Sequence, residues 1–558
     1  MGADLELLWL LAVHLVLTGL PAALAVFVAA RRGLRDVPLL LCVALAASGA
    51  AAMLSFWAFY LDPLVGQVAA FLLALGSAQG IYLCRPDRLD RELLRELAAP
   101  AALWALASLF VVYLGFLYGG SEGPLTIAAT RFSHPLPPDN QIPLHFANWY
   151  YENGSSPTPP PFGDWLSSDR PPLQVGYVLS QRAFGWDESG LHYQVLAVVV
   201  QQLWVVAMWA LLVAARLRPL ARGLAIVAAM VSDIAIVHGF FVWPKLIAAA
   251  FVLAALAMVV SGRWSGLRED WRAGALFAAL CGFAMLAHGA SAFAVIPLLG
   301  YAVLRGIPSL RWLAAAALVA VALLGSWSAY QRFADPPGDR LLKWQLGGAL
   351  AIDDRGALEA IVDGYEEAGF DGTLANKRAN AEAIVRGKDL GEALDSAADG
   401  IGGGEPGQTV EALRLPRFFW LFPFLGLLLL GPLAMLVARI RGRPEGAEWR
   451  FALTSLGFSL AVAATWALLL FGGSEAPTTI HQGTLLLPLL AVCGCVVGAF
   501  AAWRPLGIGL AALSVLLALA LYAPAPTLEP RSFSLLAALL AAAGLAGFGW
   551  VALRTAPR

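Results

Sequence analysis

The chain is poor in charged residues and in cysteine. Of its 558 residues only 13% are charged and 59% are hydrophobic, whereas soluble domains carry about 25% charged residues. This shortage excludes an ordinary soluble domain, and a net charge of -1 offers nothing to attract a nucleic acid. All five cysteines lie in or beside apolar segments, which favours packing over disulfides or a metal site.

The sequence also lacks the short motifs of several common activities. It has no Walker A loop for phosphate, no glycine-rich dinucleotide motif with its acidic partner, and no zinc-ligand pattern. Nucleotide-driven transport and redox chemistry therefore have no support. No repeat of fixed period runs along the chain.

Long apolar segments are abundant instead. A membrane-spanning helix needs about 20 apolar residues, and about fifteen segments reach or approach that length. Because these runs are continuous and do not alternate, they exclude a strand barrel. The predicted spans are 5–30, 37–60, 63–84, 97–118, 191–215, 220–240, 243–261, 273–289, 291–304, 312–330, 416–438, 451–471, 484–502, 506–522 and 533–553. We therefore predict an all-α polytopic membrane protein with about 13–15 transmembrane helices.

The short loops between these segments alternate between basic and non-basic. Every second loop, starting after the first span, is rich in arginine, and these loops hold 22 of the 37 lysines and arginines. Basic short loops stay in the cytoplasm, so the amino terminus is predicted outside and the carboxyl terminus inside. Both long hydrophilic loops, 119–190 and 331–415, then lie outside the cytoplasm. The Ala, Arg and Gly usage is typical of a bacterium, hence of an inner membrane.

The first outer loop, 119–190, gathers the polar side chains best suited to chemistry. A short helix is predicted at about 141–152, and Asp139 or Asn140 could cap its start. A membrane protein gains no core stability from such a polar block, so we expect catalysis or binding at the membrane surface. The second outer loop, 331–415, has helical periodicity and is predicted to form a small helical cap.

Three short patterns in the first outer loop resemble those of a known family. They are "DN" at 139–140, "GDW" at 163–165 and "RPPL" at 170–173. In this order they are similar to the GT-C glycosyltransferases, especially the lipid A aminoarabinose transferases and the protein O-mannosyltransferases. The resemblance covers mainly 97–215. It implies a GT-C-like helix bundle that transfers a sugar from a polyprenyl-phosphate carrier on the outer membrane face.

The resemblance also suggests how the chain is organised. Residues 97–505 would form the GT-C-like membrane module, which contains both outer loops. Residues 1–96 would be an added unit of three spans, and 506–558 would be further spans at the carboxyl end.

Two roles follow from the resemblance. Asp139 matches the first acid of the family's pair, the proposed base that takes a proton from the acceptor hydroxyl as it attacks the anomeric carbon with inversion. Its alternative role is the helix cap. Arg170 matches a basic residue and could bind the carrier phosphate. Alternatively it is an interfacial arginine paired with Asp169. Asn140 replaces the family's second acid, which weakens a paired-carboxylate site for a divalent metal, so no cofactor is expected.

Two further candidates depend on chemistry more than on motifs. Lys245 is the first basic residue in the short outer loops and could meet the phosphate or anchor its span at the headgroups. His481, in the outer loop "SEAPTTIHQG", could hold a sugar or phosphate or lie in an ordinary solvated loop. With Arg170, Asn140 and Asp169 they complete the predicted substrate-binding set. Arg340 and Lys343 of the second outer loop could line the mouth of the same binding cavity, but the favoured expectation is that they are solvated or face headgroups.

The sequence thus predicts an inner-membrane glycosyltransferase. Its partners would be a polyprenyl-phosphate sugar donor, a glycan, lipid or protein acceptor, and the lipid bilayer, but no nucleic acid. One alternative is a transporter or flippase of lipid-linked substrates, which usually needs polar residues throughout the membrane and an internal repeat. The other is a non-catalytic scaffold whose outer loops bind a partner, which Asn140 in place of an acid keeps open.

Overall fold

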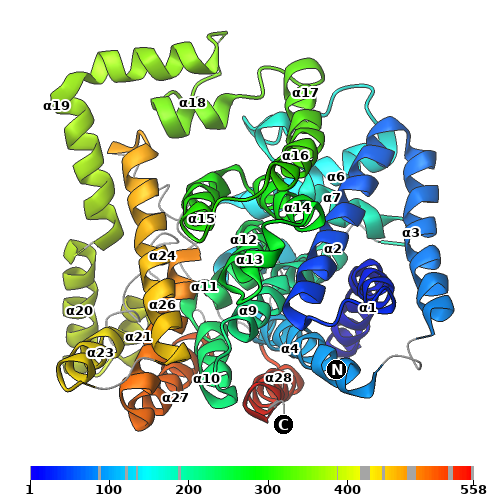
Figure 1. Ribbon diagram of the computed structural model, residues 1–558. Coiled ribbons are helices and arrows are strands. Elements are labelled where there is room, and N and C mark those ends of the chain that lie inside the picture. Colours follow the sequence, from blue (N-terminus) through cyan, green and yellow to red (C-terminus); the bar gives the residue numbers. More distant parts are fainter. Residues whose placement is uncertain are drawn as a thin grey trace.

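The computed structural model describes 2–85, 90–119, 123–132, 136–186, 190–352, 354–385, 387–414, 428–442, 446–473, 486–525 and 532–554. The chain is almost wholly helical (Figure 1). In the described residues the strands β1 (Tyr118–Gly119) and β2 (Ser532–Phe533) pair antiparallel, with Tyr118 opposite Phe533. The pairing joins the start of the first outer loop to the segment before the last helix.

The helices begin and end close to the predicted limits of the apolar segments. Before the second outer loop they are α1 (Gly2–Arg31), α2 (Val37–Leu61), α3 (Pro63–Cys84), α4 (Arg91–Gly115), α5 (Pro124–Thr130), η2 (Pro138–Gln141), α6 (Ile142–Asn153), η3 (Ser167–Asp169), α7 (Leu173–Arg182), α8 (Leu191–Gln201), α9 (Leu203–Ala214), α10 (Pro219–Met230), α11 (Asp233–Phe241), α12 (Lys245–Val260), α13 (Trp264–Leu267), α14 (Trp271–Ala287), η4 (Gly289–Ser291), α15 (Ala292–Leu304), α16 (Leu310–Ala320), η5 (Val321–Gly325) and α17 (Ser326–Phe333). From the second outer loop onward they are α18 (Arg340–Gly347), α19 (Ala357–Val385, kinked at Gly369), α20 (Gly387–Gly402), α21 (Pro406–Leu413), α23 (Leu430–Ile440), α24 (Ala447–Leu469), α26 (Leu486–Ala502), α27 (Arg504–Tyr522) and α28 (Leu535–Arg554).

The prediction of an all-α, multi-pass membrane protein is confirmed. Within the described ranges nine helices are long and apolar enough to cross a membrane, and the bent pair α10–α11 could make a tenth. Five shorter apolar helices accompany them. The total of about 13–15 spans stays a prediction, and part of the predicted span 416–438 lies outside the described residues.

Several predicted spans are broken, and polar residues mark one of the breaks. The helices α10 and α11 meet at an angle of 54°. There the Ser232 hydroxyl accepts a hydrogen bond from the Ala235 amide at 3.4 Å, and Asp233 accepts from Ile234 at 2.8 Å. These side chains satisfy amides that a new helix start leaves without partners. In contrast, the segment 310–333 continues through a π-helical turn, η5.

Helix α2 lies in the middle of the bundle. It packs against α7, α9, α12 and α14. Its backbone approaches α7 so closely that a Cβ added to Gly176 would lie 2.2 Å from the Ala52 carbonyl oxygen. The three spans within 1–96 are thus part of the common core, and residue 96 does not mark a gap between packed units. The proposed three-part division stays a prediction.

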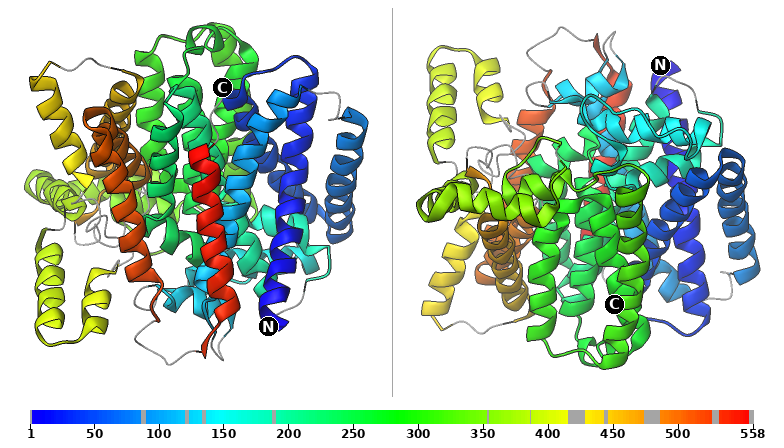
Figure 2. Two further views of the ribbon diagram at one scale, coloured as in Figure 1. Left: turned by 90° about the horizontal axis from the view of Figure 1, so that it is seen from below. Right: turned by 90° about the horizontal axis from the view of Figure 1, so that it is seen from above.

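The two chain ends lie at opposite ends of the bundle (Figure 2). The first outer loop lies at the amino-terminal end, where the Ser534 hydroxyl donates to Asp4 at 3.0 Å. At the other end the basic loops meet acidic residues, with Arg263 3.1 Å from Asp36 and Arg218 2.6 Å from Glu448. This separation agrees with the predicted alternation of loops. Which end faces the cytoplasm stays a prediction.

Both outer loops are tied to the carboxyl end of α27. Arg131 of the first loop donates to the carbonyl oxygens of Tyr522 at 2.9 Å and Pro524 at 3.1 Å. Arg414 of the second loop donates to those of Leu521 at 2.8 Å and Pro524 at 3.0 Å. The last carbonyls of a helix lack partners within the helix and carry partial negative charge. Two buried arginines therefore fix the two loops to one helix end.

Candidate functional site

A cavity of about 460 Å³ lies at the end of the bundle that carries the first outer loop. Its walls come from the first outer loop, from the segment just before α12, from α14, α15, α17 and α18, and from the end of α24. The polar side chains in its lining are Asp139, Asp169, Arg170, Gln174, His288, Ser328, Gln331, Asp339 and Gln345. Most of the remaining lining is apolar and includes Phe146, Met285, Phe293, Leu346 and Leu469. The cavity thus combines polar groups with an extensive apolar wall.

The helix η2 presents Asp139 to this cavity. The predicted helix at 141–152 is confirmed as α6, but among the described residues no side chain caps η2 or α6. The capping role weighed for Asp139 is therefore wrong. Instead its Oδ2 atom lies 3.4 Å from a terminal nitrogen of Arg170, and both side chains are mostly buried.

Arg170 follows η3 and is held between aromatic rings. Its guanidinium carbon lies 4.0 Å from the ring centre of Trp165 and 5.9 Å from that of Trp243. Burial lowers the pKa of Arg170, and the nearby carboxylates of Asp139 and Asp169 oppose this effect. Arginine stays protonated in proteins, so the cavity wall carries a fixed and poorly hydrated positive charge. The arrangement suits an oxyanion.

The side chain of Asp169 stabilises the helix η3. Its side chain is fully buried, and its Oδ2 atom accepts a hydrogen bond from the Leu166 amide at 2.9 Å, which closes η3. Burial raises the pKa of Asp169, opposed by this hydrogen bond and by the charge of Arg340. The contact partner of Arg170 is therefore Asp139, and the predicted pairing of Arg170 with Asp169 is replaced by a contact of Asp169 with Arg340 at 3.6 Å.

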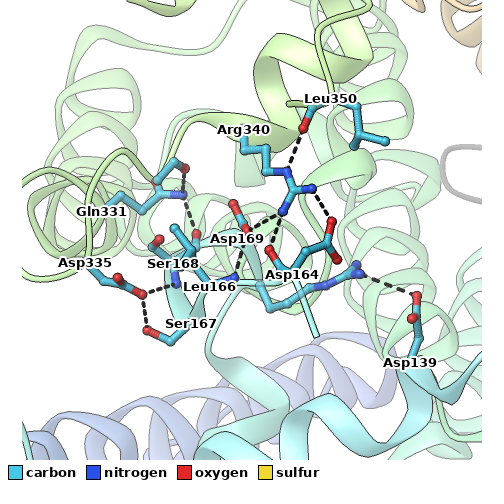
Figure 3. A network of polar contacts seen from close by, with 12 residues as sticks. Asp139, Asp164, Leu166, Ser167, Ser168, Asp169, Gln331, Asp335, Arg340 and Leu350 are labelled. Carbon is cyan, nitrogen blue, oxygen red and sulfur yellow. Dashed lines mark hydrogen bonds and ion pairs between the residues drawn. The ribbon is translucent and has the colours of Figure 1, made fainter. Parts of the chain in front are cut away.

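Arg340 joins the two outer loops (Figure 3). It donates to the Asp164 carboxylate at 2.6 Å, to the Asp164 carbonyl oxygen at 2.5 Å and to the Leu350 carbonyl oxygen at 2.7 Å. Its guanidinium also lies 4.6 Å from the Trp165 ring centre, so Trp165 contacts both Arg340 and Arg170. The expectation that Arg340 is solvated is wrong. The residues of the "GDW" pattern position Arg170 and dock α18 on the first loop.

A second polar network lies beside this one (Figure 3). The Asp335 carboxylate accepts from the Ser167 hydroxyl at 2.6 Å and from the Ser168 amide at 3.2 Å. The Gln331 amide donates to the carbonyl oxygens of Ser168 at 3.0 Å and Gly338 at 2.6 Å. Because Gln331 also lines the cavity, these bonds fix the wall that the second loop contributes.

The other predicted binding residues do not meet in the cavity. Asn140 is fully buried and donates to the Leu125 carbonyl oxygen at 3.0 Å. Lys245 is buried beside Trp243, with its Nζ atom 3.5 Å from the ring centre. Neither belongs to the described residues that line the cavity, so direct contact with a substrate has no support from their positions. His481 lies outside the described residues.

The structure brings residues to the cavity that the sequence did not indicate as binding residues, among them His288, which was expected to be a helix-end histidine and no more. Asp339 lines it from the second loop, paired with the buried Lys343 at 3.0 Å, so the expectation of a solvated Lys343 is also wrong. Gln174 and His288 line it from α7 and from the end of α14. In the sequence, His288 is marked as a cavity residue only by its position at the break between two apolar segments. Asp339 lies in a turn that resembles the start of any helix.

The described residues contain no group of three or more histidine, cysteine, aspartate or glutamate side chains placed to hold a metal ion. Comparisons of the chain with protein-family models, curated proteins and solved structures find no match. A proposal about function therefore depends on the geometry of the cavity together with the sequence patterns.

Proposed function

We propose that the chain is a glycosyltransferase of the GT-C type. It would move a sugar from a polyprenyl-phosphate donor to a hydroxyl of a glycan, lipid or protein acceptor on the outer face of a bacterial inner membrane. One observation carries the proposal. Asp139 and Arg170, the two residues marked by the family resemblance, contact each other at 3.4 Å in the wall of one cavity.

The composition of the cavity suits a lipid-linked donor. Ligand cavities usually measure about 300–1,000 Å³, so 460 Å³ can hold a phosphate and one sugar. The apolar part of the lining reaches the outside of the bundle at Ile296, Leu342 and Leu469, which are 48%, 48% and 40% exposed. A lipid chain could leave the cavity there and continue into the bilayer while its phosphate stays at Arg170.

The charges support a direct displacement. Asp139 would accept the proton of the acceptor hydroxyl as its oxygen attacks the anomeric carbon. The bond between that carbon and the phosphate oxygen would break, and the leaving phosphate would keep the electron pair and gain negative charge. Arg170 would stabilise this charge in a poorly hydrated site. Attack opposite to the leaving group inverts the anomeric configuration.

The contact between the two residues gives the donor a further role. Arg170 is the partner of Asp139 in the structure described here. A donor phosphate would compete for the same guanidinium and release the carboxylate. The base would then become available to the acceptor when the donor is bound.

The test uses the full-length protein in nanodiscs with a panel of polyprenyl-phosphate pentoses and hexoses and with cell-envelope extract as acceptor. Released polyprenyl phosphate and labelled product are both measured. Asp139→Asn should lower the transfer rate by about 10²–10⁴-fold, the usual contribution of a general base. Asp363→Asn, which alters an outer-loop carboxylate paired with Arg355, is the matched control and should be active.

Each outcome decides between the alternatives. Unchanged transfer by Asp139→Asn at normal membrane level would remove Asp139 as the base. No donor cleavage by the wild-type protein with any sugar, together with movement of labelled lipid between leaflets in proteoliposomes, would favour the flippase. The absence of both donor cleavage and lipid movement would favour the scaffold.

A further inference from the structure

The second outer loop carries exposed apolar side chains that the proposed reaction does not use. They are Leu358 and Val362 in the first half of α19, and Phe370 and Leu374 just after its kink at Gly369. Their exposed fractions are 77%, 45%, 82% and 59%. A water-facing cap gains nothing from such a row, because an apolar side chain that stays in water contributes no hydrophobic stabilisation.

The spacing of these residues is that of an amphipathic helix. Leu358 and Val362 are four residues apart, as are Phe370 and Leu374, and residues at this spacing share one side of a helix. Of the exposed glutamates in the first half, Glu359 and Glu367 lie about 100° and about 180° from Leu358 around the axis, whereas Glu366, four residues after Val362, borders the apolar side. A helix of this kind typically lies in the plane of a membrane surface.

The position of α19 agrees with this pattern. Helix α18 and the first half of α19 run crosswise to the long spans (Figures 1 and 2). The second half of α19 is bound to the carboxyl end of α24, where the Asn380 amide donates to the carbonyl oxygens of Ala467 at 3.1 Å and Leu470 at 2.9 Å. Because α24 is a membrane span, α19 is held at the level where that span ends.

The apolar row also continues a lipid-facing surface. On α24 itself, Leu460 and Leu468 are 70% and 64% exposed, as expected for side chains that face acyl chains. Leu468 lies two residues before Leu470, whose carbonyl oxygen accepts the hydrogen bond from Asn380 of α19, so α19 is attached next to the lipid-facing side chains at the end of α24. The exposed glutamates argue against binding to anionic headgroups, which they would repel.

We infer that α19 lies on the outer leaflet and inserts Leu358, Val362, Phe370 and Leu374 among the lipid acyl chains, with its glutamates in water. The partner is the bilayer itself and not a protein. This inference is independent of the proposed reaction, since it uses no residue of the cavity. It has a consequence for the cavity, because α18 in the same loop contributes Leu341, Leu342 and Leu346 to its lining and would be held at lipid depth.

The test places single nitroxide labels on the full-length protein in phosphatidylcholine nanodiscs. Cys84 is replaced by serine, because the other four cysteines are buried. The labelled positions are 358, 362, 370 and 374, with 359 and 367 as matched controls on the same helix. Power saturation then compares collision with oxygen, which dissolves in lipid, and with a water-soluble nickel chelate.

Oxygen should exceed nickel at the four apolar positions, and the ratio should reverse at the two control positions, 359 and 367. Nickel in excess at 358 and 370 would show a solvated cap and overturn the inference. Protection from both reagents would indicate a protein partner or a second copy and would overturn it equally. Independently of any variant, a lipid with a photoreactive acyl chain should label wild-type peptides from 356–376, and absence of such adducts alongside labelled α24 peptides would also refute it.

Discussion

The contacts of Arg340 allow a quantitative prediction about how the two outer loops hold together. Arg340→Met keeps the length and much of the apolar volume of the side chain but removes all five N–H donors. Both the carboxylate and the carbonyl oxygen of Asp164 then lose a donor, as does the Leu350 carbonyl oxygen. The buried carboxylate of Asp169, 3.6 Å away, loses its nearest positive charge among the ion pairs of the described residues.

These losses differ in size because the partners differ in burial. The Asp164 side chain is 72% exposed, so its ion pair contributes only about 0–1 kcal/mol. The Asp169 side chain is fully buried, and removing the partner of a buried charge costs about 3–5 kcal/mol. We therefore expect Arg340→Met to lower the free energy of unfolding by about 3–5 kcal/mol and Asp164→Asn by less than about 1 kcal/mol.

A double-mutant cycle separates the two contributions. Arg340→Met is combined in turn with Asp164→Asn and with Asp169→Asn, and the free energy of unfolding is measured in mixed micelles with tryptophan fluorescence. The coupling energy with Asp169 should exceed that with Asp164 by about 2 kcal/mol. Arg340→Lys keeps the positive charge but loses the planar guanidinium with its several donors. Its free energy of unfolding should lie between those of wild type and Arg340→Met. A larger coupling with Asp164, or an Arg340→Met variant within about 0.5 kcal/mol of wild type, would refute the reasoning.

Three further changes test other parts of the structure. Arg170→Met should reduce donor cleavage by about 10²–10³-fold at unchanged membrane level, because it removes the charge that meets the leaving phosphate; an active variant would remove that role. The Arg340 hydrogen bond lowers the pKa of Asp164 below 3.8, so its contribution to stability should be complete above pH 3.8 and lost as pH falls through the lowered pKa. The unfolding midpoint of wild type should therefore converge on that of Asp164→Asn in acid, and parallel curves would contradict this. Gly176→Leu should lower the free energy of unfolding by about 1–3 kcal/mol or more, because it overpacks α7 against α2, and the unfolding midpoint should fall. An unchanged midpoint would mean that residues 1–96 are loosely attached.

The apolar helices were predictable because their signals are local. Each span is a continuous apolar run, and the alternation of basic and non-basic loops is found by counting the lysines and arginines in each loop. The breaks were not predictable in the same way, since the sequence stays apolar through the bend between α10 and α11 and through the π-helical turn η5. Only Ser232 and Asp233 mark the bend, and in the sequence they resemble any polar pair inside a span.

The site was predictable only in part, for a physical reason. Asp139 and Arg170 belong to one loop, and their convergence followed from the resemblance of that loop to a family. Arg340 and Lys343 were expected at the surface because long basic side chains usually remain there. The buried Arg340 pairs with Asp164, which lies 176 residues away in the sequence, whereas Lys343 pairs with the nearby Asp339. A single sequence does not show which distant charges neutralise each other.

The polar residues buried among the spans bear on the transport alternative. Gln174 donates to the Val242 carbonyl oxygen at 2.9 Å, Gln194 donates to that of Phe240 at 2.6 Å, and Gln201 accepts from the Ile247 amide at 3.1 Å. All three bonds satisfy backbone groups at or near the break between α11 and α12, which apolar surroundings would otherwise leave unpaired. These glutamines therefore support the break that carries Trp243 to the cavity, next to Arg170. The side chains of these three glutamines are thus engaged with backbone groups at one end of the cavity, where a transporter would need polar side chains free along a path.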